Sequence, residues 1–600
     1  MPYTNPILPG SNPDPSIVRV GHDYFLVTST FEYTPSAPIY HSRDLIQWKL
    51  ITHAITRPSQ LQIQTPEPGG GVWATTIRYH EATRTFYVIA ASFSRYRPQD
   101  DDRVWPRGFY VKTDWEGIWD PTGKSWSESV WLDAVGFDQD LFFDDDGTVY
   151  LSSTYRKHER TLPSADGKPL KDFAIHISTI DLQTGNVTSA PKLIRSSSSG
   201  VSEGSHIFKR GKYYYLFTAE GGTESGHSEW VCRSEDSPFG PWEAGPVGEV
   251  NPLFGSGVSR DDEVQNTGHA DFVEDVDGNW WAVFLGVRPV WRETEQRWEG
   301  SVFGRETFLA PVTWENNWPV VNSKQRITLA VDSLHLYHYT LSVEWRDDFT
   351  SETLQLGWYR KNTPLKKDYA LLAFPTRPDQ NTNVSRGLRL LGAPYTLSTP
   401  SCPTLFLRKQ TAQYCTWETK LLFFPDTVNV EAGTVVYLNY YTFVSIGIRL
   451  DPSHTESEDI DGPPDRAVGG VGGKRKRIIR FTPSNTHNTP GFSSKAVDIP
   501  LVSRTSAVVL RIECGDSYRF GFREVVADAD ADAGSGPGAE QPEAIAVEVQ
   551  WVGEVSNRAL VEAPLPIGAP FTGAMLGLYS VGDREAVRVP ADFEYVQIRG

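Results

Sequence analysis

Three carboxylates and one histidine stand at matching distances in front of similar sequence segments. Each lies eight or nine residues before a short aromatic segment; the four are Asp14, Asp138, Glu203 and His269. In a fifth segment the same offset falls on Thr75 and Thr76, shortly after Trp73. Carboxylates that share a site raise one another's pKa, which lowers stability unless the arrangement serves function. One acid that protonates a departing oxygen and one carboxylate that activates water would suit cleavage of a glycosidic bond.

Each of the four residues also has an ordinary structural explanation. Asp14 lies in an Asn-Pro-Asp-Pro sequence, where an Asx-type turn is common. Asp138 could be a second turn aspartate, Glu203 an exposed acid at a strand start, and His269 a structural histidine. The joint placement of the four residues, and not any one of them, favours catalysis.

The elements that must position these residues repeat along the chain. Five similar segments start 62 to 67 residues apart; they are HDYFLVTS, RTFYVIAA, GTVYLSST, GKYYYLFT and GNWWAVFL. Each follows another strand-like run and a turn, and a third strand comes after it. Repeated small antiparallel sheets bury their faces by packing radially, so the period predicts a five-bladed β-propeller over residues 1–321. Equivalent positions at the inner strands then converge on the propeller axis.

The periodicity ends after the fifth unit. Residues 322–343 are expected to be a linker. Spaced strand-like runs in 344–600 predict a β-sandwich, and two low-complexity stretches, 454–476 and 527–543, are expected to be surface loops. The chain is therefore expected to be all-β, which agrees with 19 Trp, 25 Tyr and 29 Phe beside 50 Gly and 42 Pro.

Composition excludes several classes of function. The net charge of −18 disfavours binding to nucleic acid or to an anionic membrane surface. No apolar run approaches the about 20 residues that span a bilayer. Four cysteines are too few for a disulfide framework. No secretory signal is visible, so a cytoplasmic location is expected, or a secreted one if a signal has been removed.

Ordered motifs along the whole chain resemble glycoside hydrolase family 43. The motifs include NPILPGSNPDPS, TSTFEY, GFDQDLFFDDDG, EGSHIFK, TGHADFVE, GRETF and, near the C-terminus, FTGAMLGLYSVG. Within that family the chain is similar to two-domain β-xylosidases and α-L-arabinofuranosidases. The resemblance implies a five-bladed propeller followed by a lectin-like, concanavalin A-like β-sandwich.

The resemblance also implies roles for individual residues. Asp14 would be the general base, Glu203 the general acid and Asp138 the modulator of its pKa. The family inverts the anomeric configuration, for which base and acid stand about 6.5–9.5 Å apart. The expected substrate-binding residues are Phe31, Glu32, Trp73, His269, Arg288, Arg305 and Phe520. Arg305 would hold Asp138 ionised, bind a sugar hydroxyl or close a blade as an ion pair, and Phe520 would close the pocket from the second domain.

The sequence departs from the family pattern at two places beside the expected site. Thr75 stands where the family has proline, and Gln139-Asp140 replaces a small dipeptide and adds a carboxylate. These changes affect the expected substrate preference and not the reaction type.

The expected activity is removal of terminal β-D-xylosyl residues from xylo-oligosaccharides or arabinoxylan fragments. A predominant α-L-arabinofuranosidase and a non-catalytic carbohydrate-binding propeller remain alternatives. A retaining fructan hydrolase is disfavoured because the chain lacks its Asn-Asp-Pro and Arg-Asp-Pro motifs. The chemistry requires no cofactor, although a calcium ion at the propeller axis, reached by His269 through water, is left open. Homo-oligomerisation is also left open.

Overall fold

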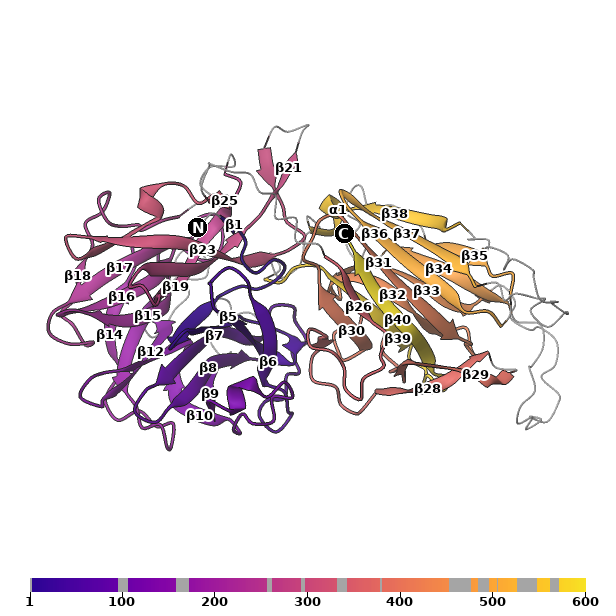
Figure 1. Ribbon diagram of the computed structural model, residues 1–600, viewed down its shortest axis with the longest axis horizontal. Helices are drawn as coiled ribbons and strands as arrows, with labels where there is room; N and C mark the ends of the chain where they lie inside the picture. The colour runs from indigo at the N-terminus through magenta and orange to yellow at the C-terminus, as the bar shows by residue number, and fades with distance from the viewer. Residues whose placement is uncertain are drawn as a thin grey trace, which may run out of the picture.

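The chain folds into two β-rich domains that lie side by side (Figure 1). The computed structural model describes residues 3–94, 106–157, 172–255, 262–292, 297–331, 343–377, 380–452, 476–483, 496–503, 505–525, 548–561 and 571–600. The low-complexity stretches 454–476, apart from its last residue, and 527–543 lie outside these ranges. The helical segments described are η1 (Gly117–Trp119), η2 (Asn322–Lys324) and α1 (Asn557–Val561). No helix in the described ranges is long and apolar enough to cross a membrane.

The N-terminal domain is a five-bladed β-propeller, which confirms the prediction from the repeat. Each blade is an antiparallel four-stranded sheet whose strands follow chain order. The first two blades are formed by β2 (Ser16–Val20), β3 (Asp23–Val27), β5 (Ser36–Ser42), β6 (Lys49–Ile55), β7 (Gly71–His80), β8 (Thr85–Phe93), β9 (Arg107–Asp114) and β10 (Val130–Val135). The third and fourth are formed by β11 (Phe137–Phe143), β12 (Val149–Arg156), β13 (Phe173–Thr179), β14 (Lys192–Ser196), β15 (Ser202–Arg210), β16 (Tyr213–Glu220), β17 (Ser228–Ser234) and β18 (Glu243–Ala244). The fifth is formed by β19 (Gln265–Glu274), β20 (Trp280–Val287), β23 (Arg305–Glu315) and β24 (Trp318–Val321), with the hairpin β21 (Val290–Arg292) and β22 (Arg297–Glu299) inserted between β20 and β23.

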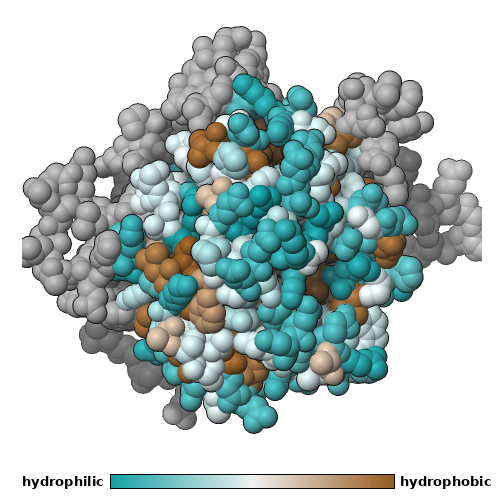
Figure 2. Space-filling model, turned by 90° about the vertical axis from the view of Figure 1, so that its left-hand side faces the viewer, coloured by the Kyte–Doolittle hydropathy of each residue, from teal (hydrophilic) through white to brown (hydrophobic). Residues whose placement is uncertain are grey.

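The first strand of every blade lies innermost, and these strands form a closed ring. Strands β2, β7, β11, β15 and β19 contact one another in that order, and β19 contacts β2. Aromatic side chains fill the space between blades; the Phe217 and Phe272 rings, for example, stack with centroids 3.9 Å apart. The side of the propeller that faces away from the second domain is mainly hydrophilic, with its hydrophobic residues in small separate patches (Figure 2). Apolar burial therefore occurs between the blades.

The propeller extends slightly past the expected boundary. Strand β24 ends at Val321, where the boundary was expected. However, β25 (Ala330–Val331) pairs with β1 (Tyr3–Thr4), so part of the expected linker 322–343 returns to the N-terminal strand. This pairing ties the start of the chain to the end of the propeller.

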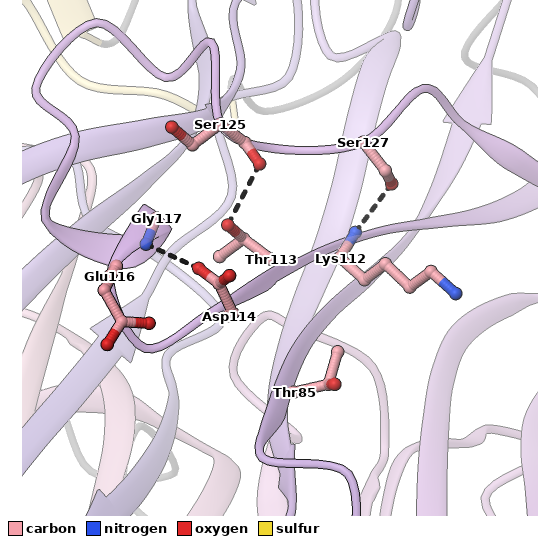
Figure 3. Close-up of a pocket in the computed structure, with 8 residues that line it drawn as sticks. All are labelled: Thr85, Lys112, Thr113, Asp114, Glu116, Gly117, Ser125 and Ser127. Atoms are coloured by element: carbon pink, nitrogen blue, oxygen red, sulfur yellow. Dashed lines mark hydrogen bonds between the residues drawn. The ribbon is translucent and has the colours of Figure 1, made fainter.

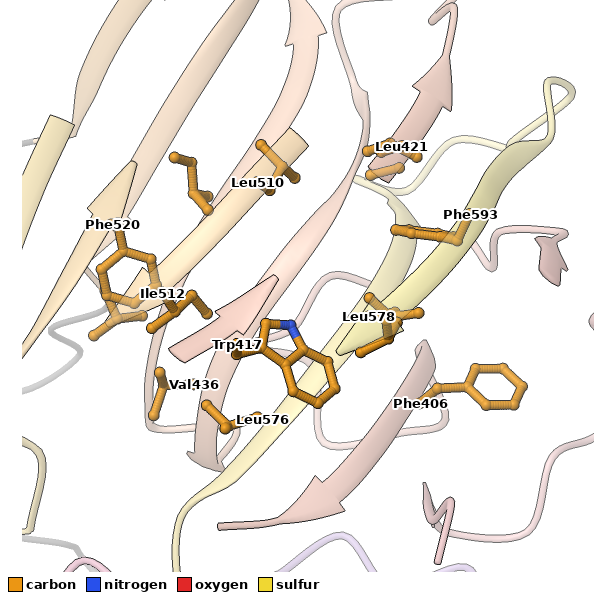
Figure 4. Close-up of a cluster of buried hydrophobic side chains, with 14 of the residues drawn as sticks. Phe406, Trp417, Leu421, Val436, Leu510, Ile512, Phe520, Leu576, Leu578 and Phe593 are labelled. Carbon is orange, nitrogen blue, oxygen red and sulfur yellow. The ribbon is translucent and has the colours of Figure 1, made fainter. Parts of the chain in front are cut away.

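The C-terminal domain is a sandwich of two antiparallel sheets. One sheet contains β26 (Trp345–Asp347), β28 (Tyr369–Arg377), β29 (Gln380–Leu390), β31 (Cys415–Phe423), β36 (Val508–Cys514), β37 (Ser517–Glu524), β38 (Gln550–Ser556) and β40 (Ala591–Arg599). The other contains β30 (Thr404–Lys409), β32 (Val430–Asn439), β33 (Thr442–Leu450), β34 (Arg477–Pro483), β35 (Val497–Pro500) and β39 (Met575–Gly582). Trp417 lies in the apolar core between them (Figure 4). Its buried indole nitrogen donates to Thr434 Oγ1 at 2.7 Å, so the core leaves this polar group satisfied.

Backbone contacts join the two domains. Strand β4 (Tyr33–Thr34) of the propeller pairs with β27 (Arg360–Lys361) of the second domain. At a second contact the backbone nitrogen of Ala574 donates to the carbonyl of Val302 at 2.6 Å. Glycine is required there, because a Cβ on Gly573 would lie 2.1 Å from a propeller carbonyl oxygen. This close approach brings the sandwich segment 571–574 against the propeller.

Candidate active site

A residue with positive φ lies near the start of each inner strand. These residues are Asp14 (φ 52°), Ala74 (φ 32°), Asp138 (φ 51°), Gly204 (φ 58°) and His269 (φ 53°). In β7, β11, β15 and β19 the residue coincides with a break in the pairing register, as in a β-bulge. Such a conformation costs a non-glycine residue about 1–3 kcal/mol, so it persists where the surroundings impose it.

This backbone position corrects two of the expected equivalences. In the second blade it is occupied by Ala74 and not by Thr75 or Thr76. In the fourth blade it is occupied by Gly204, so Glu203 precedes it by one residue. A side chain at Gly204 would be strained, because its Cβ would lie 3.0 Å from the His269 ring. Glycine there lets the backbone of the fourth blade approach the His269 ring of the fifth.

Asp14 is buried and paired with a permanent positive charge. Its Oδ1 atom lies 3.1 Å from Arg305 Nη1 and 3.8 Å from His269 Nδ1. The same Arg305 nitrogen donates to Thr223 Oγ1 at 2.8 Å, and Arg305 Nε donates to the carbonyl oxygen of Phe571 at 3.4 Å. A charge-assisted contact of this kind fixes the position and orientation of the Asp14 carboxyl group.

The charges of the other two carboxyl groups, Glu203 and Asp14, both act on Asp138. Burial raises its pKa well above the ordinary value, and the nearby Glu203 and Asp14 raise it further. The backbone N–H of Gly204, which donates to Asp138 Oδ2 at 3.0 Å, and the charge of Arg305 oppose this shift. Arg305 forms its ion pair with Asp14 and not with Asp138. Asp138 therefore holds a proton more tightly than an isolated aspartic acid would.

A second polar cluster fills the propeller axis. The Arg78 guanidinium forms ion pairs with Asp140 (Nε to Oδ1, 2.8 Å) and Asp271 (Nη1 to Oδ2, 2.7 Å). Its Nη2 atom lies 2.9 Å from His206 Nδ1, and Ser16 donates to Asp271 Oδ2 at 2.6 Å. Burial alone would raise the pKa of Asp271, but Arg78 and the hydrogen bonds lower it overall. Asp140 thus belongs to the axis cluster, although the sequence suggested an additional carboxylate beside the catalytic acids.

These axial residues do not fit a calcium ion. Ca²⁺ takes six to eight oxygen ligands, whereas Asp140 and Asp271 already bind the Arg78 guanidinium. In the described part of the chain, no three His, Cys, Asp or Glu side chains are grouped so that they could hold a metal. Burial lowers the pKa of His269 to about 4, so its imidazole is neutral near pH 7 and offers one donor and one acceptor to a ligand.

Aromatic side chains form a wall beside Asp14 and Arg305. Trp73 and Phe571 are half-buried and meet edge to face at 5.5 Å between ring centroids. Phe31 contacts both rings, at 6.1 Å and 5.4 Å, and is only 2% exposed. Phe31 therefore supports the wall, while Trp73 and Phe571 keep surface that a sugar ring could contact.

The structure corrects the expected role of Phe520. Its side chain is fully buried in the core of the sandwich (Figure 4), where its ring centroid lies 5.4 Å from that of Phe481. Phe571 is instead the second-domain aromatic residue beside the carboxylates. The motif FTGAMLG begins at Phe571, so a signal existed in the sequence, but only the tertiary structure places this residue near Arg305.

Two further expectations change. Glu32 is 1% exposed and its Oε2 atom accepts from the Gly69 N–H at 3.1 Å, so it cannot contact a sugar in this structure. Burial raises the pKa of Glu32 to about 7. Arg288 forms two hydrogen bonds with the buried carboxylate of Glu306, at 2.9 and 3.0 Å, so it has a structural contact in addition to the sugar contact expected of it. Thr223, which contacts Arg305, lies outside every motif used above and was missed.

A separate pocket lies on the outer part of the second blade (Figure 3). Its polar groups largely satisfy one another: Asp114 accepts from the Gly117 N–H at 2.8 Å, and Thr113 donates to the Ser125 carbonyl at 3.0 Å. None of the candidate catalytic residues lines it. The carboxylates near the axis remain the candidate active site.

Comparisons with known proteins agree with this geometry. The family model for glycosyl hydrolases family 43 matches residues 3–319, and the model for the beta xylosidase C-terminal concanavalin A-like domain matches residues 346–460. A non-reducing end alpha-L-arabinofuranosidase of Bacteroides ovatus is 33% identical over 608 residues, covering 100% of this chain and 94% of the relative. A beta-xylosidase of Bacillus subtilis is 29% identical, covering 75% of this chain and 80% of the relative.

Solved structures share the whole two-domain architecture. The structure of the GH43B protein of a Bacteroides ovatus xyloglucan PUL aligns with a TM-score of 0.75 and 31% identity, with 100% of both chains covered. The structure of a xylan beta-1,4-xylosidase from Bacillus halodurans aligns with a TM-score of 0.77 and 26% identity, again over 100% of both chains. The propeller, the sandwich and the carboxyl groups Asp14, Asp138 and Glu203 agree with these matches. The chain belongs to family 43 of the glycosyl hydrolases.

Proposed function

We propose that this protein removes terminal non-reducing β-D-xylosyl residues from xylo-oligosaccharides with inversion of the anomeric configuration. The observation that carries the proposal is the contrast between two carboxyl groups of one site. Asp14 is paired with Arg305 at 3.1 Å, whereas burial and the neighbouring Glu203 raise the pKa of Asp138. One site thus contains a carboxyl group paired with a cation and a carboxyl group whose pKa is raised, which is the kind of contrast that glycoside hydrolysis uses.

The proposed reaction is a single displacement. Asp14 takes a proton from a water molecule as its oxygen bonds to the anomeric carbon. The bond from that carbon to the leaving oxygen breaks, and Glu203 gives its proton to the leaving oxygen. Two adjacent carboxylates repel each other, so Asp138 and Glu203 retain one proton between them, which Glu203 donates in the reaction. Base and acid are expected to stand about 6.5–9.5 Å apart.

A preference for terminal sugars follows from the second domain. Phe571 and its backbone carbonyl approach Arg305, and we infer that the sandwich narrows the substrate site beside the carboxylates. A pocket bounded in this way accepts the end of a chain more readily than its middle. Xylo-oligosaccharides and arabinoxylan fragments are therefore the proposed substrates.

A predominant α-L-arabinofuranosidase is the second candidate. It is favoured by the relative with that name that matches this chain over its full length. Xylobiose and an arabinose-decorated xylo-oligosaccharide should be incubated separately with the enzyme and the released sugars identified. Faster release of xylose supports the first proposal, and faster release of arabinose supports the second. Release of no sugar from either substrate would support a non-catalytic carbohydrate-binding propeller.

The stereochemistry is tested by proton NMR of the first anomer released. The proposal requires the anomer opposite to that of the substrate. Retention would contradict the roles of Asp14 and Glu203, because a retaining enzyme forms a covalent intermediate with a nucleophilic carboxylate.

A further inference from the structure

A lysine of the sandwich contacts the propeller segment that carries the proposed general base. Lys409 is the last residue of β30, and its Nζ atom donates to Asn12 Oδ1 at 2.7 Å. Asn12 lies two residues before Asp14 and is only 3% exposed. The contact therefore crosses the domain interface close to the site.

Asn12 is the anchor of this propeller segment. Its Oδ1 atom also accepts from the Tyr40 hydroxyl at 2.8 Å. Its backbone N–H donates to the Arg305 carbonyl at 2.9 Å, and its own carbonyl accepts from Thr307 Oγ1 at 2.6 Å. Asn12 thus connects Lys409 to β23, the strand that carries the ion-pair partner of Asp14.

The backbone between Asn12 and Asp14 is restricted, so a displacement of Asn12 also displaces Asp14. Pro13 and Pro15 flank Asp14, and the proline ring restricts φ, so few backbone rotations are free in this stretch. Asp14 itself has a φ of 52°, a conformation that depends on its surroundings. A small shift of Asn12 therefore moves the carboxylate, and a misplacement of about 1 Å can reduce a catalysed rate by about 10²-fold.

The surroundings of Lys409 argue against a purely structural role. Within the described ranges Lys409 forms no ion pair with a carboxylate, and its amine lies 5.2 Å from the centroid of the Tyr359 ring. His53 and the neighbouring Arg408 also lie close to this enclosed region, as their shared contacts with Tyr359 show. Burial lowers the pKa of Lys409 to about 7, so a lysine here costs stability that an apolar side chain would not.

We propose that Lys409 is a positioning residue for Asp14, so that the sandwich domain takes part in the chemical step through Asn12. This inference rests on the proposed function. It assigns the second domain a role separate from closing the pocket with Phe571. Lys409 touches neither the substrate nor the reacting atoms in this proposal.

The test compares Lys409→Met with a control at the same interface. Lys361 is a second interface lysine; it donates to the Ser401 carbonyl at 2.8 Å, and burial lowers its pKa to about 8. Lys361→Met therefore removes an interface amine without touching Asn12. Turnover of xylobiose and of an aryl xyloside is measured for both variants, and melting temperature and circular dichroism report folding.

The proposal predicts a change in kcat and not in KM. Lys409→Met should lower kcat by about 10-fold or more, within the range that misplacement of a catalytic group produces, and leave KM within about twofold. The loss should be equal for both substrates, because the base acts whatever the leaving group is. Lys361→Met should retain wild-type kcat, and Lys409→Arg, which keeps a side-chain N–H donor, should recover part of the lost activity.

A milder variant keeps the inference testable if Lys409→Met does not fold. Tyr40→Phe removes the hydroxyl that donates to Asn12 Oδ1 and leaves Lys409 in place, and it should lower kcat in the same way. Equal kcat in wild type, Lys409→Met and Tyr40→Phe would overturn the inference, as would an equal loss in Lys361→Met. If the wild type releases no pentose from any of the tested substrates, the proposed function itself fails and this inference with it.

Discussion

Arg305 and Asp14 lie at opposite ends of the propeller sequence, yet Arg305 Nη1 lies 3.1 Å from Asp14 Oδ1. Arg305 begins β23 of the fifth blade, whereas Asp14 precedes β2 of the first. Closure of the propeller ring therefore forms the ion pair that holds the proposed base. The Arg305 guanidinium also donates to the Phe571 carbonyl of the sandwich, so residues of both domains contact this guanidinium.

Replacement of the proposed acid separates two kinds of substrate. Glu203→Ala should lower kcat/KM for xylobiose by about 10²–10⁴-fold, the range that general acid–base assistance contributes. An aryl xyloside with a good leaving group should lose much less, because that group barely needs protonation. Steady-state kinetics on both substrates check this. An unchanged rate with xylobiose would refute the assignment of Glu203.

Replacement of the proposed modulator changes the pH profile. Asp138→Asn removes a carboxyl group whose pKa is raised by burial and by the neighbouring Glu203 and Asp14. Without that repulsion, the remaining acid loses its proton at lower pH. The basic limb of the profile of kcat/KM should therefore move to lower pH, and a shift to higher pH would contradict the role of Asp138 as modulator.

The same carboxyl group should reduce the stability of the protein near neutral pH. A raised pKa means that the folded state binds the proton more tightly than the unfolded chain, so stability falls as pH rises above the ordinary Asp value of about 4. Asp138→Asn should raise Tm at pH 7 and have a smaller effect at pH 4. Thermal scans at both pH values measure this difference. A fall in Tm at pH 7 would show that Asp138 stabilises the fold.

Alanine substitution at two phenylalanines of the sandwich should affect different properties, KM at one position and stability at the other. Phe571→Ala should leave Tm nearly unchanged but raise KM for xylobiose, because Phe571 is half-buried and contacts Arg305. Phe520→Ala should destabilise the sandwich by about 3–5 kcal/mol, because Phe520 is fully buried in the core. Kinetics and thermal unfolding of both variants decide the matter. A change in KM for Phe520→Ala alone would restore the original expectation.

The axis cluster should depend on Arg78 and not on a metal. Arg78→Met leaves Asp140 and Asp271 buried without their cation and should cost about 3–5 kcal/mol of stability. Arg43→Met, which removes an exposed partner of Asp23, should cost only about 0–1 kcal/mol. Chelation of divalent metals should leave wild-type activity and Tm unchanged. A loss of either property that added calcium restores would contradict the role of Arg78.

The period of the aromatic segments was enough to predict the propeller, and its offsets were enough to select Asp14, Asp138, Glu203 and His269. The offsets were less accurate at single-residue resolution. In the second and fourth blades the position with positive φ falls on Ala74 and Gly204, and backbone conformation of this kind leaves no clear mark in the pattern of apolar residues.

The sequence by itself determined the elements that repeat, because strand patterns and turns are local and recur with each blade. Only the tertiary structure decided which distant side chains meet: Arg305 with Asp14, Phe571 with the aromatic wall, Lys409 with Asn12 and Arg78 with the axial carboxylates. These contacts depend on ring closure and on the approach of one domain's backbone to the other. Local periodicity carries no information about either.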